Sequence, residues 1–220
     1  MKTYTVGNLK GGVGKTTSTV NLGYSFSQLG KRVLLVDADP QANLTAIFFR
    51  AKQTRNSIRK VFQDPRKVKK TIYRTKYQNI DMIPGDTDLL EEDVENVGSL
   101  KQALESVADR YDLCLIDTRP AMERITLAAL YASDVLLTPV CLDKFCRDNL
   151  LLVEEKYGAF CEQVREVDWK IFANKVENKK AQRNTYEDMS VRHCWPIMET
   201  CISKGAVVEN ALEYYKPVLL

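Results

Sequence analysis

Two lysines on either side of a glycine run form the part of this sequence with the clearest chemistry. Residues 8–17 read Asn-Leu-Lys-Gly-Gly-Val-Gly-Lys-Thr-Thr, so Lys10 precedes the glycines and Lys15 follows them. Glycines let the backbone turn tightly and approach an anion, and consecutive N–H groups then point at that anion. The pattern predicts a phosphate-binding loop between a strand and a helix.

Each residue of this loop has an expected role. The Lys15 ammonium suits the β- and γ-phosphates of a nucleotide, and the Thr16 hydroxyl suits Mg²⁺. A structural glycine turn is the alternative, but the strand–loop–helix setting makes it the weaker one. The predicted nucleotide-binding residues of the loop are Lys10, Gly11, Gly12, Val13, Gly14, Lys15, Thr16 and Thr17.

Two apolar runs, 31–37 and 112–117, each end in an aspartate. Such runs are typical of strands buried on both faces of a parallel sheet, whose carboxyl ends bind ligands. We therefore expect Asp37 and Asp117 beside the loop, acting on Mg²⁺ through its water shell. Asp39 is the candidate that orients or activates the attacking water. Ordinary strand-end or turn aspartates remain the alternative for each.

The loop resembles the deviant Walker A motif of the ParA/MinD ATPases. It has Leu9 where an ordinary P-loop has glycine, and it carries the additional Lys10. In that family the additional lysine reaches across a dimer interface to the nucleotide of the partner subunit. The resemblance therefore implies a catalytic role for Lys10, beside Lys15 and Asp39. A surface lysine with no special role is the alternative.

Further motifs are similar to those of the ParA/Soj partition ATPases, most strongly over residues 6–45. The run Val-Leu-Leu-Val-Asp-Ala-Asp-Pro-Gln-Ala-Asn places the family's metal-linked aspartate on Asp37 and its water-activating aspartate on Asp39. Residues 114–120 are similar to the third motif, except that Arg119 replaces its first proline. Arg119 could instead contact phosphate, DNA or a partner. The terminal block matches loosely, with Ser203 and Lys204 where proline and arginine are usual.

Asn174 follows another apolar run and opens Asn-Lys-Val-Glu177. An asparagine amide can pair with the edge of adenine, which makes Asn174 a nucleotide-binding candidate. The run also resembles the Asn-Lys-x-Asp guanine motif, with a glutamate that is one CH₂ too long. The deviant loop favours ATP over GTP as the nucleotide.

The resemblance implies an ATP hydrolase that is weak without its partner, dimerises on Mg-ATP and binds DNA non-specifically. A ParB-like protein would stimulate hydrolysis, and the protein would be cytoplasmic and nucleoid-associated when ATP-bound. DNA contacts in the family come mainly from the C-terminal half. The residues implied here are Lys179, Lys180, Arg183 and Lys204.

Residues 50–76 contain eleven Lys and Arg against one acid, Asp64, a net charge of +10 in a chain whose total is +3. The remainder of the chain therefore carries −7. Charge segregated in this way can attract a polyanion or an acidic partner. A DNA role and a solvated basic helix face are equally good interpretations of this segment.

Three other functions fit less well. A MinD-like membrane ATPase needs a C-terminal amphipathic helix, and the sequence shows no tail to form one. A reductase like the nitrogenase iron protein needs suitably placed cysteines, but Cys114 lies within a strand-like run and the six cysteines form no CxxC pair. A binding module without hydrolysis is disfavoured by Lys15 and Asp39. We expect reduced thiols, no metal cluster and no membrane partner.

Composition and periodicity indicate a single α/β domain over residues 1–220, with 45% hydrophobic and 28% charged residues. The pattern predicts a three-layer P-loop NTPase fold with a predominantly parallel sheet and helices on both faces. Expected strands are 2–7, 31–37, 79–84, 112–117, 134–140 and 169–174, with 197–202 strand-like. Expected helices are 17–29, 87–97, 99–110, 122–132, 145–164, 179–192 and 206–214.

Overall fold

The computed structural model describes residues 1–50 and 54–218. A seven-stranded sheet runs through the molecule in the order β3-β4-β2-β5-β1-β6-β7, and every described pairing is parallel except β3 with β4. The strands are β1 (Lys2–Val6), β2 (Val33–Ala38), β3 (Tyr73–Arg74), β4 (Ile80–Ile83), β5 (Leu113–Thr118), β6 (Val135–Cys141) and β7 (Asp168–Asn174).

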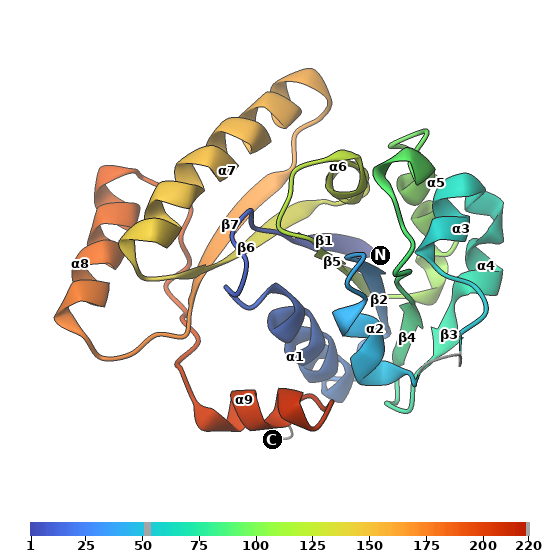
Figure 1. Cartoon of the computed structure of the whole chain (residues 1–220), viewed down its shortest axis with the longest axis horizontal. Coiled ribbons are helices and arrows are strands. Elements are labelled where there is room, and N and C mark those ends of the chain that lie inside the picture. Colours follow the sequence, from blue (N-terminus) through green and yellow to red (C-terminus); the bar gives the residue numbers. More distant parts are fainter. Residues whose placement is uncertain (51–53, 219–220) are drawn as a thin grey trace.

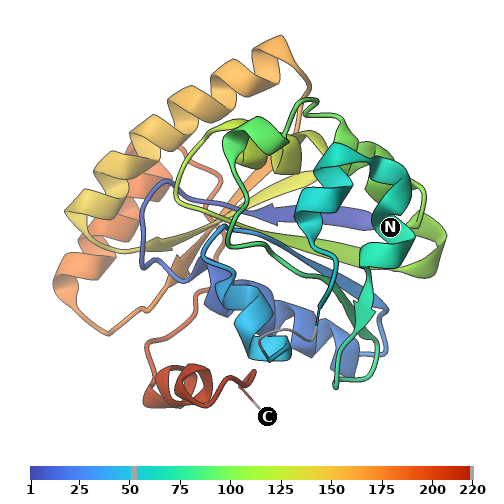
Figure 2. The same ribbon diagram turned by 45° about the vertical axis from the view of Figure 1, so that its right-hand side comes forward.

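Helices cover both faces of this sheet, which confirms the three-layer α/β prediction (Figure 1). In both ribbon views α1, α2 and α9 lie on one side of the sheet and α5, α6 and α7 on the other (Figure 2). The helices are α1 (Lys15–Gln28), α2 (Asn43–Phe48), α3 (Ile58–Gln63), α4 (Val68–Thr71), α5 (Ser99–Glu105), α6 (Arg124–Tyr131), α7 (Lys144–Gln163), α8 (Lys180–Glu187) and α9 (Ala206–Glu213).

The central strands explain why both faces need covering. All six residues of β2 are buried. Successive side chains of a strand point to opposite faces, so Val33 and Leu35 join the core under α1 and α2, whereas Leu34 and Val36 join the core under α3, α5 and α6. A strand that is apolar on both faces fits only inside such a sandwich.

A third core lies at the β6–β7 edge, where α7 packs on the sheet. Leu150 and Val153 of α7 are almost fully buried there against Ile171 of β7. The Trp169 indole donates a 3.0 Å hydrogen bond to Thr138 Oγ1, which satisfies its buried N–H. None of the helices among the described residues is long and apolar enough to cross a membrane.

The prediction of a helix over 87–97 is wrong. This stretch forms only one short turn, Glu91–Asp93, between turns and irregular backbone. The Asp86 and Asp93 carboxylates accept the backbone N–H groups of Asp88 and Leu90. Such local hydrogen bonds offer the backbone an alternative to a helix.

Three other expected elements differ in extent. The helix over 99–110 ends at Glu105 and resumes as a single turn at Ala108–Arg110. The helix over 179–192 ends at Glu187 and continues as a π-helical turn, Asp188–Arg192, that places Met189 in the core. Residues 197–202 form no strand: Ile197 makes a single bridge to Ile171, and Ser203, just after this stretch, makes one to Val176.

Candidate nucleotide-binding site

The predicted phosphate loop joins β1 to α1 and ends in a left-handed turn. Gly12 and Gly14 have φ of 74° and 97°, a region that favours glycine. Ser18 N donates to Gly14 O at 2.9 Å, so the helix begins directly at the end of the loop. N–H groups at a helix N-terminus attract anions, and the loop therefore has the geometry of a phosphate cradle.

Two substitutions in the loop should have contrasting effects on stability. A Cβ on Gly14 would lie 2.3 Å from the Asn174 amide nitrogen, at a positive φ, whereas a Cβ on Gly11 would meet nothing within 4 Å. We expect Gly14→Ala to lower the free energy of unfolding by about 1–3 kcal/mol. Gly11→Ala, the control, should change it by under about 1 kcal/mol. Urea unfolding measures both, and equal losses would contradict this geometry.

Lys15 opens α1 and is only 7% exposed. Its ammonium donates a 3.0 Å hydrogen bond to Lys10 O, within the loop. Burial lowers the pKa of Lys15, and the carboxylates of Asp117 and Asp39 act in the opposite direction. The structure therefore places a poorly solvated lysine in the cradle, beside the expected phosphate position.

Thr16 and Asp117 come together as predicted, although they are 101 residues apart. Thr16 Oγ1 donates to Asp117 Oδ2 at 2.7 Å. Asp117 lies opposite Asp37 in the β2–β5 register and opposite Val6 in the β1–β5 register. Burial, and then the neighbouring Asp37 carboxylate, raise the pKa of Asp117 well above its usual range. Two acids thus lie buried beside the loop.

Asp37 is completely buried and makes three hydrogen bonds. Its Oδ2 accepts from Thr45 N at 2.8 Å and from Thr45 Oγ1 at 2.6 Å, and its Oδ1 accepts from Asp39 N at 3.2 Å. Burial nevertheless raises the pKa of Asp37 to about 6. Because its oxygens already accept hydrogen bonds, this carboxylate is suited to act on a cation through water.

Ionisation of Asp37 should make nucleotide-free protein less stable as the pH rises. The folded pKa of about 6 exceeds the ordinary value of 3.8, so the stabilising contribution is fully present below about pH 4 and lost above about pH 6. This shift corresponds to roughly 3 kcal/mol. Urea unfolding with a chelator present, at about pH 4.5 and pH 7.5, should capture roughly 2 kcal/mol of this loss, because the rest occurs below pH 4.5. Asp37→Asn, the control, should reduce it; an unchanged pH dependence would contradict the assignment.

The oxygen donors at this end of the sheet fit Mg²⁺. Mg²⁺ prefers oxygen ligands, keeps several waters and needs only one or two carboxylates beside the phosphates. Thr16, Asp37 and Asp117 supply such donors around the start of α1. Over residues 1–50 and 54–218, no three His, Cys, Asp or Glu side chains gather into a site that could hold a metal unaided.

Asp39 lies just beyond β2 and is 8% exposed. Its Oδ1 accepts from Gln41 N at 2.9 Å, and its carbonyl accepts from Ala42 N at 2.9 Å, at a turn where Ala42 has a φ of 51°. These contacts fix the carboxylate at the cradle end of the sheet, close enough to Lys15 to affect the pKa of that lysine.

Asn174 reaches the loop from the end of β7. Its Nδ2 donates to Val13 O at 2.8 Å, and its Oδ1 accepts from Lys175 N at 2.9 Å. Lys175 Nζ in turn donates to Gly12 O at 3.0 Å. In this structure the Asn174 amide therefore supports the phosphate loop, and its contact with a base stays a prediction.

The Lys10 side chain contacts residues of its own chain. Its ammonium lies 3.3 Å from Asp143 Oδ1 and 5.6 Å from the centre of the Phe145 ring. Asp143 also begins α7, where its Oδ1 accepts from Cys146 N at 2.8 Å. The predicted reach of Lys10 to a partner subunit thus requires it to leave this contact. No sequence pattern pointed to Asp143, which is 133 residues from Lys10.

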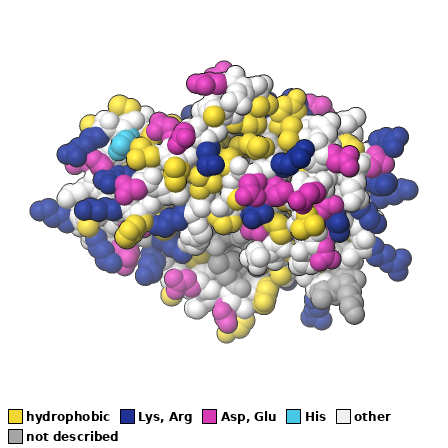
Figure 3. Space-filling model, turned by 45° about the horizontal axis from the view of Figure 1, so that its top comes forward, with side chains coloured by type: hydrophobic (Ala, Val, Ile, Leu, Met, Phe, Trp, Pro, Cys, Tyr) yellow, Lys and Arg dark blue, Asp and Glu magenta, His cyan; other side chains and the backbone are white. Residues whose placement is uncertain are grey.

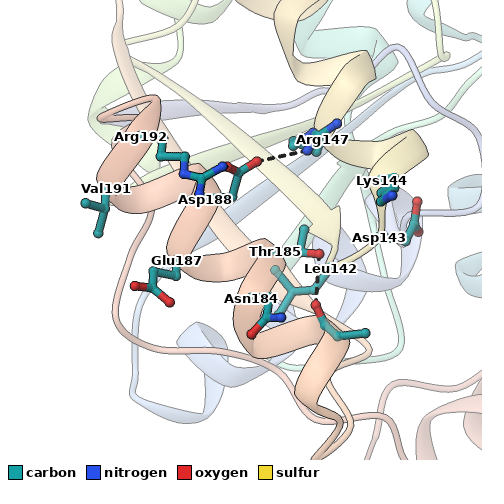
Figure 4. Close-up of a pocket in the computed structure, with 11 residues that line it drawn as sticks. Leu142, Asp143, Lys144, Arg147, Asn184, Thr185, Glu187, Asp188, Val191 and Arg192 are labelled. Atoms are coloured by element: carbon teal, nitrogen blue, oxygen red, sulfur yellow. Dashed lines mark hydrogen bonds and ion pairs between the residues drawn. The ribbon is translucent and has the colours of Figure 1, made fainter.

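A cavity of about 640 Å³ lies beside Asp143, between α7 and α8 (Figure 4). Arg147 crosses it to form a 3.0 Å ion pair with Asp188, which also pairs with Arg192 at 3.2 Å. These ion pairs join the start of α7 to the π-helical turn after α8. The cavity is therefore next to the Lys10 contact but separate from the phosphate loop.

Arg119, which replaces a proline of the third motif, binds acids of its own chain. Its guanidinium lies 3.0 Å from Glu91 Oε1 and 3.6 Å from Glu123 Oε2. The second Glu91 oxygen accepts from Ile125 N at 3.0 Å, near the start of α6. Arg119 thus connects the loop after β5 to the irregular stretch that contains Glu91.

The four predicted DNA-binding residues lie around the start of α8, and all are exposed. The bridge between Val176 and Ser203 brings Lys204 to this place, and Lys204 N donates to Val176 O at 2.9 Å. Lys179 pairs with Glu177 at 2.9 Å, so part of the positive charge is compensated there. The structure gathers these cations but shows no ligand on them.

Comparison with known proteins agrees with this geometry. The sequence pattern of the AAA domain family matches residues 1–165. The virulence plasmid ParA family protein pGP5-D of Chlamydia psittaci is 35% identical over 171 residues, or 74% of this chain and 64% of that protein. Sporulation initiation inhibitor protein Soj of Bacillus subtilis is 37% identical over 156 residues, or 68% and 62%. The matched stretches thus span less than two thirds of these two relatives.

Solved structures share the fold over nearly the whole chain. Apo McdA of Cyanothece superposes with a TM-score of 0.88 at 24% identity, covering 99% of this chain and 92% of that one. MinD of Pyrococcus horikoshii, complexed with Mg-ADP, superposes with a TM-score of 0.78 at 21% identity, covering 99% and 87%. The family pattern shows that this chain belongs to the AAA domain family, and ParA and Soj proteins are among its relatives.

Proposed function

We propose that this protein is an ATPase that dimerises on Mg-ATP, binds DNA non-specifically and drives DNA partitioning, with hydrolysis stimulated by a ParB-like partner. The observation that carries the nucleotide part is the 2.7 Å hydrogen bond between Thr16 and Asp117, which joins the phosphate loop to a buried acid pair. The ParA and Soj relatives support the partitioning part.

The residues of the site divide the work of hydrolysis. The N–H groups of Gly11–Thr17 bind the phosphates, and Lys15 neutralises their charge. Thr16, Asp37 and Asp117 would hold Mg²⁺, which when bound neutralises charge on the β- and γ-phosphates. Asp39 orients the attacking water. Because burial removes competing water, these charges act more strongly than they would in solution.

Lys10 is proposed to connect hydrolysis to dimerisation. In the single chain its ammonium contacts Asp143 at 3.3 Å. A surface ion pair of this kind contributes little stability, so the negative charge of a triphosphate in a facing subunit can compete for the lysine. ATP then favours the dimer because it contacts both subunits, and hydrolysis lowers that preference.

DNA binding is proposed for Lys179, Lys180, Arg183 and Lys204 in the ATP-bound dimer. Exposed Lys and Arg side chains bind phosphates without regard to sequence and release counterions, so the affinity should fall steeply with salt. Lys179, Lys180 and Arg183 lie within nine positions of Asn174, whose amide contacts the phosphate loop. Nucleotide state can therefore affect their position.

Fluorescence anisotropy with a random-sequence duplex, at low salt with ATP, tests the DNA role. Lys180→Ala/Arg183→Ala should weaken duplex binding about tenfold or more. Lys31→Ala/Lys156→Ala removes the same charge from exposed positions elsewhere and should weaken binding less than about threefold. If wild-type protein with ATP forms no duplex complex, or if both variants lose affinity equally, the proposed DNA surface is wrong.

A further inference from the structure

A second basic surface lies away from α8, where α2, β3 and the C-terminal end of α9 surround a groove of about 1,010 Å³. Arg50, Arg74 and Lys76 line it, and no Asp or Glu is among its described lining residues. Figure 1 places α2 and β3 toward one end of the molecule and α8 at the other. The groove is therefore separate from the surface proposed for duplex DNA.

Aromatic rings also line this groove, and two of them are unusually exposed. Tyr214 is 72% exposed and Tyr215 57% exposed, just after α9. Across the groove, the Phe49 ring packs edge-on against Tyr73 with 6.0 Å between ring centres. The Tyr73 hydroxyl accepts hydrogen bonds from Arg55 N and Asn56 N, which fixes this wall. The groove thus combines a rigid aromatic wall with exposed rings.

The charge around the groove extends over α3 and α4. Lys60, Lys69 and Lys70 of the same basic segment are exposed there. Figure 3 shows Lys and Arg side chains gathered at both ends of the face that it presents. Lys52 of this segment lies outside the described residues. The groove is accordingly set in a field that attracts polyanions.

We propose that this groove binds single-stranded nucleic acid. Proteins that bind single strands combine a positively charged groove for the backbone with aromatic side chains on which bases stack. Both features are present here, from Arg74 and Lys76 on one side to Tyr214 on the other. A duplex keeps its bases stacked inside and offers this groove only phosphates, and an acidic peptide offers no flat bases. The proposal needs neither ATP nor a dimer and goes beyond the partitioning function.

Binding of a fluorescent oligothymidylate of about 12 nucleotides to nucleotide-free protein at low salt tests this proposal. Arg74→Ala/Lys76→Ala should weaken binding about tenfold. Lys69→Ala/Lys70→Ala is the matched control: it removes the same charge from exposed positions of the segment that do not line the groove. The control should lose less than about threefold. Equal losses would mean that net charge, not the groove, binds the strand, and would overturn the proposal.

Variants of Tyr214 distinguish the contribution of base stacking to single-strand binding from that of charge. Tyr214→Leu should weaken binding about tenfold, whereas Tyr214→Phe, which keeps the flat ring, should retain wild-type affinity. Equal affinity of the Leu and Phe variants, or tighter binding of a duplex of the same length, would overturn the proposal. Thermal unfolding of each variant confirms that it is folded.

Photo-cross-linking of a bromodeoxyuridine-containing strand, followed by peptide mass spectrometry, locates the contact. Cross-links in 46–50, 73–76 or 214–215 support the groove, and cross-links confined to α8 contradict it. ATP-dependent duplex binding, measured on Arg74→Ala/Lys76→Ala, should remain within about threefold of wild type. The single-strand site and the partitioning function can thus fail independently.

Discussion

Asp39→Ala is expected to lower the rate of ATP hydrolysis by about 10²–10⁴-fold, because it removes the side chain that orients the attacking water. Asp39 makes no hydrogen bond to Lys15, Thr16 or the loop among the described contacts, so binding of the phosphates should survive its loss. The variant should therefore accumulate as an ATP-bound dimer. Single-turnover hydrolysis and light scattering with ATP measure the two effects.

The control for Asp39 is Asp88→Ala, which removes one exposed carboxylate far from the loop in sequence and should leave hydrolysis unchanged. The result must also differ from that of Lys15→Ala, which should impair nucleotide binding itself. An Asp39→Ala protein that hydrolyses ATP at the normal rate would show that another group positions the water.

Lys10→Ala is expected to abolish ATP-dependent dimerisation while nucleotide binding stays within about threefold of wild type. The Lys10 ammonium is directed at Asp143 and the Phe145 ring, whereas the Lys10 carbonyl accepts from Lys15. Truncation keeps this carbonyl, so the loop should keep its shape. Hydrolysis should fall by at least about tenfold because it depends on the dimer.

Light scattering with ADP, with ATP, and with ATP plus DNA measures this dimerisation. Lys144→Ala is the matched control, since it removes one exposed positive charge next to Asp143 without touching the loop. Dimers that form normally in the Lys10→Ala protein would exclude the cross-subunit role.

The sequence was sufficient to predict the main features of the site. Apolar strands that end in acids must bring those acids to one edge of a parallel sheet, and Asp37 and Asp117 do lie opposite each other. The helix predicted over 17–29 is present as Lys15–Gln28, and Asp117 lies beside the loop as expected, where Thr16 contacts it. These predictions succeeded because local spacing and sheet geometry were enough to make them.

Other contacts depended on pairings that no local pattern encodes. The ion pairs of Lys10 with Asp143 and of Arg119 with Glu91 join segments far apart in the chain. The stretch 87–97 does not form the predicted helix, because the carboxylates of Asp86 and Asp93 accept backbone N–H groups there. Asn174 was recognised as a neighbour of the nucleotide site, but its contact with Val13 could not be read from its neighbours in sequence.

The contact between β7 and the phosphate loop has a mechanical consequence. Asn174 and Lys175 donate hydrogen bonds to the carbonyls of Val13 and Gly12. Helix α8 begins at Lys180, only five residues beyond Lys175. Because a segment of this length has a short maximum reach, a displacement of Lys175 limits where α8 can begin. Movement of the loop carbonyls on nucleotide exchange would thus shift the first turn of α8. Asn174 and Lys175 would then couple the nucleotide state to the position of α8.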